Sequence, residues 1–251
     1  MSERTVLVTG AARGIGRATA VAFAAEGATV VINHPGEPGP AEETARAVRD
    51  AGGNPAIVEA DVADPEAVQA MANTLQQEHG PIDVLVNNAG ICPFEEFFDI
   101  DVHLWDRVHA VNLRGVFLVT QAITRRMVDA GRGGRVISVS SISAWVGGAL
   151  QTHYTPSKAG ISSLMKSLAI VLGPHGITCN TVNPGVIATD INREDLARPG
   201  QRERFESRIP LGRVGRPEDI AGVITLLARP EAAYINGAEL LVDGGLFVNL
   251  Q

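Results

Sequence analysis

The sequence predicts an α/β protein with a doubly wound parallel sheet of about seven strands and helices on both faces. Three observations support this fold class. Short β-branched runs alternate with stretches of helical spacing, these runs are continuously apolar, and a glycine-rich turn directly follows the first of them. Continuously apolar strands are typical of a parallel sheet that helices cover on both sides. Right-handed crossovers then place the ligand cleft beyond the carboxyl ends of the strands.

The predicted elements alternate along the whole chain. The strands are residues 6–8, 29–32, 56–59, 84–86, 136–139, 178–182 and 239–242. The helices are residues 16–25, 41–51, 65–78, 104–128, 155–172 and 217–228. Pro65 and Pro217 stand at first-turn positions, which tolerate the missing N–H, and Asp64 is a suitable cap before the first of them. We expect a single domain over residues 1–251, with the polar segment 187–209 as a substrate loop or lid.

The composition excludes several classes of function. The chain has 251 residues, 28 acidic against 21 basic, and a formal net charge of −7. A net acidic surface repels phosphate backbones, so we expect no nucleic-acid partner. No apolar run suits a membrane span or a signal peptide. The two cysteines, Cys92 and Cys179, lack the spacing of a disulfide framework or a metal site. We therefore expect a cytoplasmic protein that needs neither a metal nor a membrane.

The glycine-rich turn has the spacing G-x-x-x-G-x-G, formed by Gly10, Gly14 and Gly16. Glycine tolerates a positive φ and lets the backbone approach a pyrophosphate, and the following helix N-terminus favours its charge. A glycine turn without a ligand is the alternative, because such turns are common.

This spacing resembles that of the short-chain dehydrogenases/reductases, and the resemblance extends over nearly the whole chain. The motif Asn-Asn-Ala-Gly occupies residues 87–90, and Asn-Pro-Gly occupies residues 183–185. Each short match alone could merely stabilise a strand end or a turn. Together, in this order, they imply a Rossmann dinucleotide site. The cofactor-binding residues that the resemblance implies are Gly10, Arg13, Gly14, Ile15, Gly16, His34, Asp61, Val62, Asn88, Ala89, Gly90, Tyr154, Lys158, Pro184, Gly185, Val186 and Thr189.

A catalytic base can be sought from the residues themselves. Hydride transfer from an alcohol needs a group that takes the hydroxyl proton, and a free tyrosine with a pKa near 10 is too weakly ionised. Lys158 stands one helical turn after Tyr154, where its charge would favour the phenolate. The family resemblance implies Tyr154 as general acid/base and Lys158 as pKa depressor and ribose clamp. It also implies that Ser141 holds the reacting oxygen and that Asn112 positions a water linking Lys158 to solvent.

The second predicted strand ends without a carboxylate in Asn33-His34-Pro35, which favours NADP over NAD. Arg13 could donate to a 2′-phosphate, although it and His34 could equally be a solvated arginine and a neutral loop histidine. Glu37 would weaken this preference if its loop folds inward, so use of NAD as well is expected.

The presumed pocket is polar and suits a substrate with several hydroxyl groups. Its polar residues are Ser141, Ser143, Gln151, His153, Thr189 and Asn192. Ser143 and Gln151 could instead only satisfy nearby backbone. Residues 88–94, 140–144, 151–156, 189–192, 194–196 and 242–251 are similar to the bacterial L-rhamnose 1-dehydrogenases. That resemblance implies oxidation of L-rhamnose, or of a relative such as L-lyxose or L-mannose, at C1 to the aldonolactone. Its substrate contacts would be Ser141, Ser143, Gln151, Tyr154 and Asn192.

Two other functions stay open. A 3-oxoacyl thioester (acyl-carrier-protein) reductase would use the same catalytic residues, and Phe94, Trp145 and Val146 could line a pocket for an acyl chain. A catalytically inactive dinucleotide-sensing module would bind the cofactor without turnover. The two longest predicted helices, 104–128 and 155–172, resemble those that pair between subunits in this family, which implies a homotetramer. The apolar tail, residues 246–250, either closes the core or forms an interface.

Overall fold

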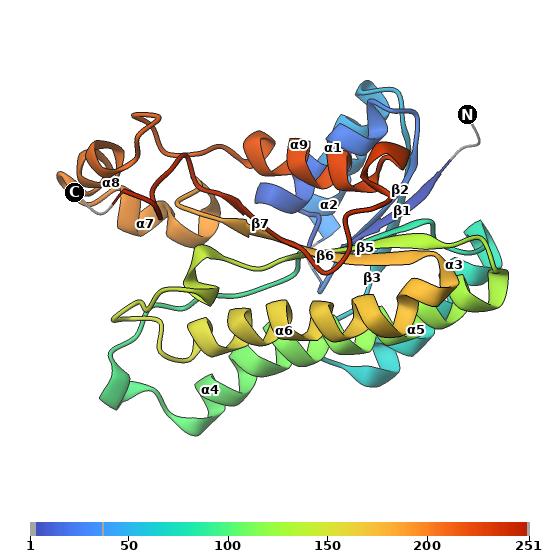
Figure 1. Ribbon diagram of the computed structural model, residues 1–251, viewed down its shortest axis with the longest axis horizontal. Helices are drawn as coiled ribbons and strands as arrows, with labels where there is room; N and C mark the ends of the chain where they lie inside the picture. The colour runs from blue at the N-terminus through green and yellow to red at the C-terminus, as the bar shows by residue number, and fades with distance from the viewer. Residues whose placement is uncertain (1–3, 37, 250–251) are drawn as a thin grey trace.

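The computed structural model describes residues 4–36 and 38–249, so Glu37 and the last residue of the apolar tail lie outside the described residues. A seven-stranded sheet with the order β3-β2-β1-β4-β5-β6-β7 forms the centre (Figure 1), and every pairing in it is parallel. This confirms the predicted fold class. The strands are β1 (Thr5–Val8), β2 (Thr29–His34), β3 (Asn54–Glu59), β4 (Val84–Asn87), β5 (Gly134–Val139), β6 (Ile177–Pro184) and β7 (Glu239–Val242).

Helices cover both faces of the sheet. The main helices are α1 (Gly14–Ala24), α2 (Pro38–Asp50), α3 (Pro65–His79), α4 (Val102–His109), α5 (Gly115–Ala130), α6 (Tyr154–Leu172) and α9 (Pro217–Ala228). Figure 1 shows α1, α2 and α9 above the sheet and α4, α5 and α6 below it. The short helices are η1 (Phe97–Asp99), η2 (Ala110–Arg114), η3 (Ile142–Ala144), η4 (Gly173–His175), η5 (Asp190–Asn192), α7 (Arg193–Leu196), α8 (Gln201–Arg208) and η6 (Pro230–Ala232).

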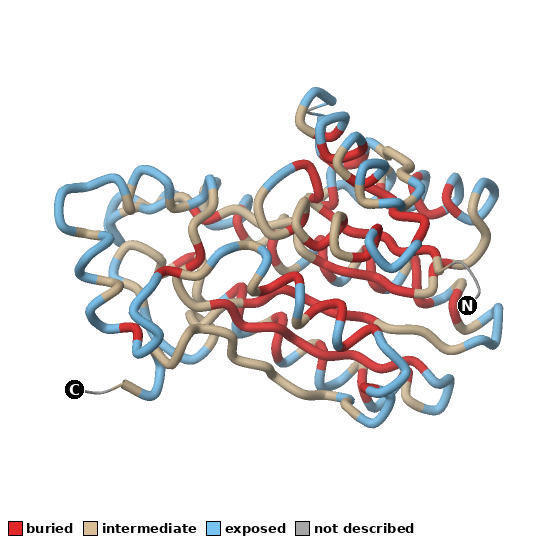
Figure 2. The backbone as a smooth tube through the Cα atoms, turned by 90° about the horizontal axis from the view of Figure 1, so that it is seen from above, coloured by how far each residue is buried: buried red, intermediate tan, exposed pale blue. Residues whose placement is uncertain are grey.

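The continuous apolar runs have the structural role that their pattern predicts. Val6 and Val8 belong to the core cluster under α1, α2 and α9, whereas Leu7 belongs to the cluster under α3, α5 and α6. All three are fully buried, because successive strand residues point to opposite faces and both faces are covered. Each such side chain stabilises the fold by about 1.5–3 kcal/mol. Figure 2 shows that buried residues gather in the strands and the inner sides of the helices.

Two boundaries differ from the prediction in ways that affect the site. The predicted helix 104–128 begins at Val102 and contains the π turn η2, which separates α4 from α5. A wider turn of this kind has no signature in hydrophobic periodicity. The second strand extends to His34, which is therefore a buried strand residue and not a loop histidine.

The segment 187–209 carries η5, α7 and α8 and lies beyond the carboxyl ends of the strands. It is joined to the turn before α9, because Ala188 N–H donates to the Gly215 carbonyl at 2.9 Å and Gly215 N–H donates to the Val186 carbonyl at 3.0 Å. In Figure 2 most of this end of the molecule is exposed or half-buried. Among the described residues no helix is long and apolar enough to cross a membrane.

Candidate active site

The glycine-rich turn joins the end of β1 to the first turn of α1. Gly10 and Gly14 have φ angles of 62° and 55°, the left-handed region that favours glycine. A methyl group at Gly16 would lie 2.4 Å from the Gly10 carbonyl oxygen, so the turn closes only around glycine. Arg13 is exposed at the N-cap of α1, and Ile15 packs against the core. The first backbone N–H groups of α1 thus lie at the carboxyl end of β1, where a helix N-terminus favours an anion.

Asn88 connects this turn to the end of β4. Its side-chain amide donates to the carbonyl oxygens of Thr9 at 2.9 Å and Gly10 at 3.1 Å. The Thr9 hydroxyl accepts from the backbone N–H groups of Asn88 and Ala89, both at 3.0 Å. These hydrogen bonds hold the carboxyl ends of two neighbouring strands together, so Ala89 and Gly90 lead away from the glycine turn in a defined direction.

Tyr154 and Lys158 lie one turn apart at the beginning of α6. Lys158 Nζ is 5.5 Å from the centroid of the Tyr154 ring and donates to the Val139 carbonyl oxygen at 3.0 Å. Ser140 Oγ donates to the Lys158 carbonyl oxygen at 2.9 Å. Since Val139 and Ser140 stand at the end of β5, the sheet itself fixes the lysine beside the tyrosine.

Burial favours the neutral form of both groups and thereby shifts both pKa values. It raises the pKa of the Tyr154 phenol, while the nearby Ser141 hydroxyl lowers it. Burial also lowers the pKa of Lys158 to about 8. An ammonium group with that pKa remains mostly charged at neutral pH, so a positive charge is available beside the phenol.

Asn112 is fully buried in η2 and links three segments. Its amide oxygen accepts from Ile91 N–H and its amide nitrogen donates to the Ile91 carbonyl, both at 2.9 Å. The same nitrogen donates to Ser157 Oγ at 3.2 Å. A methyl group at Gly90 would lie 3.3 Å from Asn112 Oδ1 and 3.5 Å from Lys158 Nζ, so Asn112 and Lys158 meet beside the loop after β4.

A chain of polar contacts extends from Ser141 to Cys92. Ser141 Oγ accepts from Ser143 N–H at 3.0 Å, and Ser143 Oγ donates to Gln151 Oε1 at 3.5 Å. Gln151 Nε2 contacts Cys92 Sγ at 3.2 Å. Cys92 is buried, and burial raises the pKa of its thiol, which therefore stays neutral. The sequence places Cys92 in segment 88–94 of the presumed pocket but assigns its thiol no role, because a single cysteine in a loop carries no spacing signal.

The segment that follows β6 passes over the glycine turn. Gly185 N–H donates to the Val242 carbonyl at 3.0 Å, which holds the turn formed by Pro184, Gly185 and Val186 at the sheet. A methyl group at Gly14 would lie 3.6 Å from Thr189 Cγ2. The structure thereby brings the predicted nicotinamide loop and the predicted pyrophosphate turn to the same place.

Asn192 makes hydrogen bonds within segment 187–209. Its amide oxygen accepts from Thr189 N–H at 3.0 Å, and its amide nitrogen donates to the Ile187 carbonyl at 2.9 Å. Both ends of the amide that the sequence assigned to the substrate are thus engaged within the loop.

The residues expected near the adenosine lie at the ends of β2 and β3. His34 is 2% exposed, and its Nδ1 accepts from Gly36 N–H at 3.2 Å. The Asp61 carboxylate accepts from Ala63 N–H at 2.9 Å, and Val62 is buried against α5. Asn33, which the sequence did not single out, donates to the Ala60 carbonyl at 3.0 Å and thereby joins β2 to the end of β3. Its amide oxygen also accepts from Gly10 N–H at 3.4 Å, and both contacts depend on the sheet order, which the sequence alone does not give.

These residues fit a nicotinamide dinucleotide. The positive-φ glycines at positions 10 and 14 and the crowded Gly16 keep side chains away from the N-terminus of α1, as close approach of a pyrophosphate requires. Within residues 4–36 and 38–249, no group of three or more His, Cys, Asp and Glu residues could hold a metal ion. The phenol of Tyr154, with the Lys158 ammonium and the Ser141 hydroxyl beside it, suits general acid–base chemistry next to an organic hydride acceptor.

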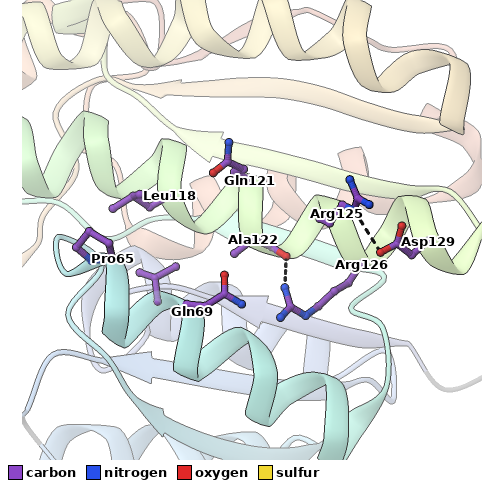
Figure 3. A pocket seen from close by; sticks show the side chains of 9 residues that line it. Pro65, Gln69, Leu118, Gln121, Ala122, Arg125, Arg126 and Asp129 are labelled. Atoms are coloured by element: carbon purple, nitrogen blue, oxygen red, sulfur yellow. Dashed lines mark hydrogen bonds and ion pairs between the residues drawn. The ribbon is translucent and has the colours of Figure 1, made fainter.

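A separate groove of about 620 Å³ lies between α3 and α5 (Figure 3). Among the residues that line this groove, Arg126 donates to the Ala122 carbonyl at 2.6 Å, and Arg125 pairs with Asp129 at 3.4 Å. None of the predicted site residues lines this groove.

The comparisons with known proteins agree with this geometry. Residues 10–247 match the family described as enoyl-(acyl carrier protein) reductase. The chain is 54% identical to the L-rhamnose 1-dehydrogenase (NAD(P)(+)) of Azotobacter vinelandii, over 99% of this chain and 98% of that one. It is 52% identical to a protein of the same name from a Sphingomonas species, over 100% and 99%. A crystal structure of a short-chain type dehydrogenase/reductase from Mycobacterium marinum superposes with a TM-score of 0.91 at 35% identity, covering 97% and 95%.

The chain therefore belongs to the short-chain dehydrogenase/reductase family of oxidoreductases. Within that family, its similarity extends over the full length of relatives named for the oxidation of one sugar.

Proposed function

We propose that the protein is an NAD(P)-dependent L-rhamnose 1-dehydrogenase that oxidises the sugar at C1 to the aldonolactone. The observation that carries the proposal is the identity above 50%, over at least 99% of this chain, to two relatives with this name. A substrate of several hydroxyl groups also agrees with the polar contacts of Ser141, Ser143 and Gln151.

In the proposed mechanism Tyr154 takes the proton of the C1 hydroxyl. The Lys158 ammonium, 5.5 Å from the ring centroid, favours the phenolate that this step requires. Ser141 would hold the reacting oxygen, since its hydroxyl lies near the phenol. Asn112 would position a water between Lys158 and solvent, which its place beside Gly90 and Lys158 supports. The nicotinamide supplies the acceptor for the C1 hydride when it is bound.

The cofactor would lie along the glycine turn, with NADP favoured and NAD also used. The residues proposed to bind it are those implied by the family motifs, from Gly10 to Thr189. Exposed Arg13 is the group best placed to meet a 2′-phosphate, because a guanidinium forms strong paired hydrogen bonds with phosphate oxygens. Substitution of Arg13 by alanine should raise the KM for NADP more than the KM for NAD.

Ser143 and Gln151 are proposed as contacts to the ring hydroxyls. Asn192 would act mainly by shaping segment 187–209, since both ends of its amide bind within that loop. We propose this segment as the part that closes over the substrate, with the rest of the chain forming a single domain.

A homotetramer in the cytoplasm is the proposed state. Ile170 and Val171 on α6 are 78% and 63% exposed, and Phe117 on α5 is 43% exposed. Apolar side chains on these two helices would be covered by pairing between subunits.

Initial rates on a panel of aldoses, each with NADP and with NAD, test the function. L-rhamnose should give the highest kcat/KM, with L-lyxose and L-mannose next. Turnover of acetoacetyl thioesters with NADPH and none of any sugar would replace the proposal with a 3-oxoacyl reductase. Cofactor binding without turnover of either class would indicate a sensing module.

A further inference from the structure

His153, the residue immediately before Tyr154, is a fully buried histidine at the start of α6. The sequence groups it with the polar residues of the pocket, yet no part of its surface reaches solvent. Among the described residues, neither ring nitrogen has a hydrogen-bond partner of normal geometry. A buried polar ring costs free energy unless it interacts with a polar neighbour, so the group that it faces is informative.

The imidazole faces the carbonyl of Pro93, which influences its pKa. Pro93 belongs to the loop after β4, and this loop lies alongside the residues that precede α6. Glu95 N–H donates to the Leu150 carbonyl at 3.1 Å, and Gln151 Nε2 contacts Cys92 Sγ at 3.2 Å. We call residues 91–94 the pocket wall. The loop after β4 thus meets the residues that precede α6 at two contacts, one of which involves Cys92 of the wall, and His153 lies against the wall at a third point.

The charge state of the imidazole follows from its surroundings. Burial lowers the pKa of His153 and is the largest effect. The Pro93 carbonyl and Glu95, in the loop, raise the pKa, and His109, at the end of α4, lowers it. At neutral pH the ring is neutral and carries one N–H, which can be directed at the Pro93 carbonyl.

We propose that His153 is a positioning residue for the sugar site: its neutral imidazole holds the Pro93 carbonyl and so fixes the pocket wall relative to Tyr154. This inference rests on the proposed function, because the wall and Tyr154 would face the sugar together. The side-chain hydrogen bonds of Asn88 join Thr9 and Gly10 to the end of β4 and do not involve His153, so cofactor binding should be independent of the imidazole.

Two substitutions of His153 distinguish a role in positioning the Pro93 carbonyl from a role in packing alone. His153→Phe keeps a ring of similar size but removes the N–H, and His153→Asn keeps an N–H donor in a smaller side chain. His153→Phe should raise the KM for L-rhamnose about tenfold and lower kcat, with the KM for NADP within about twofold of wild type. His153→Asn should recover a large part of the loss. His175→Phe, at an exposed position in η4, is the matched control and should change none of these constants.

The pH dependence gives a readout that a structural role would not move. Protonation of Tyr154 lowers kcat/KM for L-rhamnose toward acid pH in every variant that keeps this base. Since the neutral imidazole is the competent form and burial lowers its pKa, the wild type should show a second, steeper fall at a pH below the ordinary histidine pKa of about 6.5. This second fall should be absent in His153→Asn. The proposal is overturned if both variants lose only thermal stability and keep the wild-type KM values, or if the second fall persists in His153→Asn.

Histidine NMR signals test the same inference without turnover. The signals of the His153 ring, assigned from their absence in His153→Asn, should show that the ring stays neutral at pH values below the ordinary histidine pKa of about 6.5. Titration of the His153 ring at or above that value would overturn the inference. Failure of the wild type to oxidise L-rhamnose would refute the proposed function instead, and the NMR result would still decide whether the imidazole is held neutral against Pro93.

Discussion

The ammonium group of Lys158 is held 5.5 Å from the Tyr154 ring centroid by a 3.0 Å hydrogen bond to the carbonyl of Val139. The lysine is buried, with 4% of its surface exposed, so its charge acts on the phenol with little screening by solvent. The end of β5, and not the helix alone, therefore determines where this charge stands.

Tyr154→Phe should reduce kcat at least about 10³-fold, because the reaction loses the group that takes the hydroxyl proton. The Kd for NADP should stay within about twofold, measured by quenching of tryptophan fluorescence. Tyr234→Phe is the control, since Tyr234 is the other tyrosine of the chain and its side chain is fully exposed. A Tyr154→Phe enzyme with a substantial residual rate would show that another group is the base.

Lys158→Met should stabilise the fold at neutral pH while it removes activity. The folded-state pKa of about 8 lies below the ordinary lysine value of 10.5, so between these values the unfolded chain binds more protons and stability rises with pH. The difference in unfolding free energy between the variant and the wild type should therefore be about 2–3 kcal/mol more favourable to the variant at pH 7 than at pH 10.5. Urea unfolding at both pH values measures this difference. An equal effect at the two values would mean that the lysine is not desolvated.

Gly16→Ala should weaken NADP binding at least about tenfold, because the added methyl group would lie 2.4 Å from the Gly10 carbonyl oxygen and distort the turn. Isothermal titration with NADP measures the Kd. Gly222→Ala is the matched control: a methyl group in that part of α9 meets nothing within 4 Å. It should leave the Kd unchanged and stabilise the helix by about 0.5–1 kcal/mol. Equal Kd values for the two variants would contradict the role of Gly16.

Asp219→Asn should loosen the turn that anchors segment 187–209. The Asp219 carboxylate accepts two hydrogen bonds from Arg213, at 2.7 and 2.8 Å, and one from Arg216 N–H at 2.7 Å. The Arg213 hydrogen bonds are the main cause that lowers the pKa of Asp219 to about 2.

The contribution of Asp219 to stability is therefore present above about pH 4 and is lost as the pH falls toward 2. At pH 7 the variant should lose about 1 kcal/mol, a value that allows for screening of this partly exposed carboxylate. Urea unfolding should show the loss shrink as the pH falls from 7 to 3. Glu218→Gln, the adjacent position in the same turn, serves as the control and should show a smaller and less pH-dependent change.

The elements with strong local signals were predictable from the residues. All seven strands were predicted near their observed positions, because continuous apolar runs such as residues 6–8 report burial on both faces. The helix after Pro217 was predicted with its observed bounds, since proline at a first turn marks a helix start. The spacing of Tyr154 and Lys158 likewise predicts that they lie close together, because four residues make about one helical turn.

Contacts between loops from distant parts of the chain were not predictable. The π turn at Asn112, the contact of Cys92 with Gln151 and the burial of His153 against Pro93 each depend on how the segments after β4 and β5 lie side by side. Asn192 was assigned to the substrate because it is polar and near the site, whereas the structure engages its amide within its own loop. The sequence by itself therefore determined the sheet, the glycine turn and the Tyr154–Lys158 pair, which rest on local periodicity. Only the tertiary structure decided which polar side chains serve the loops and which face the site, because a hydrogen-bond partner is chosen by spatial position and not by residue type.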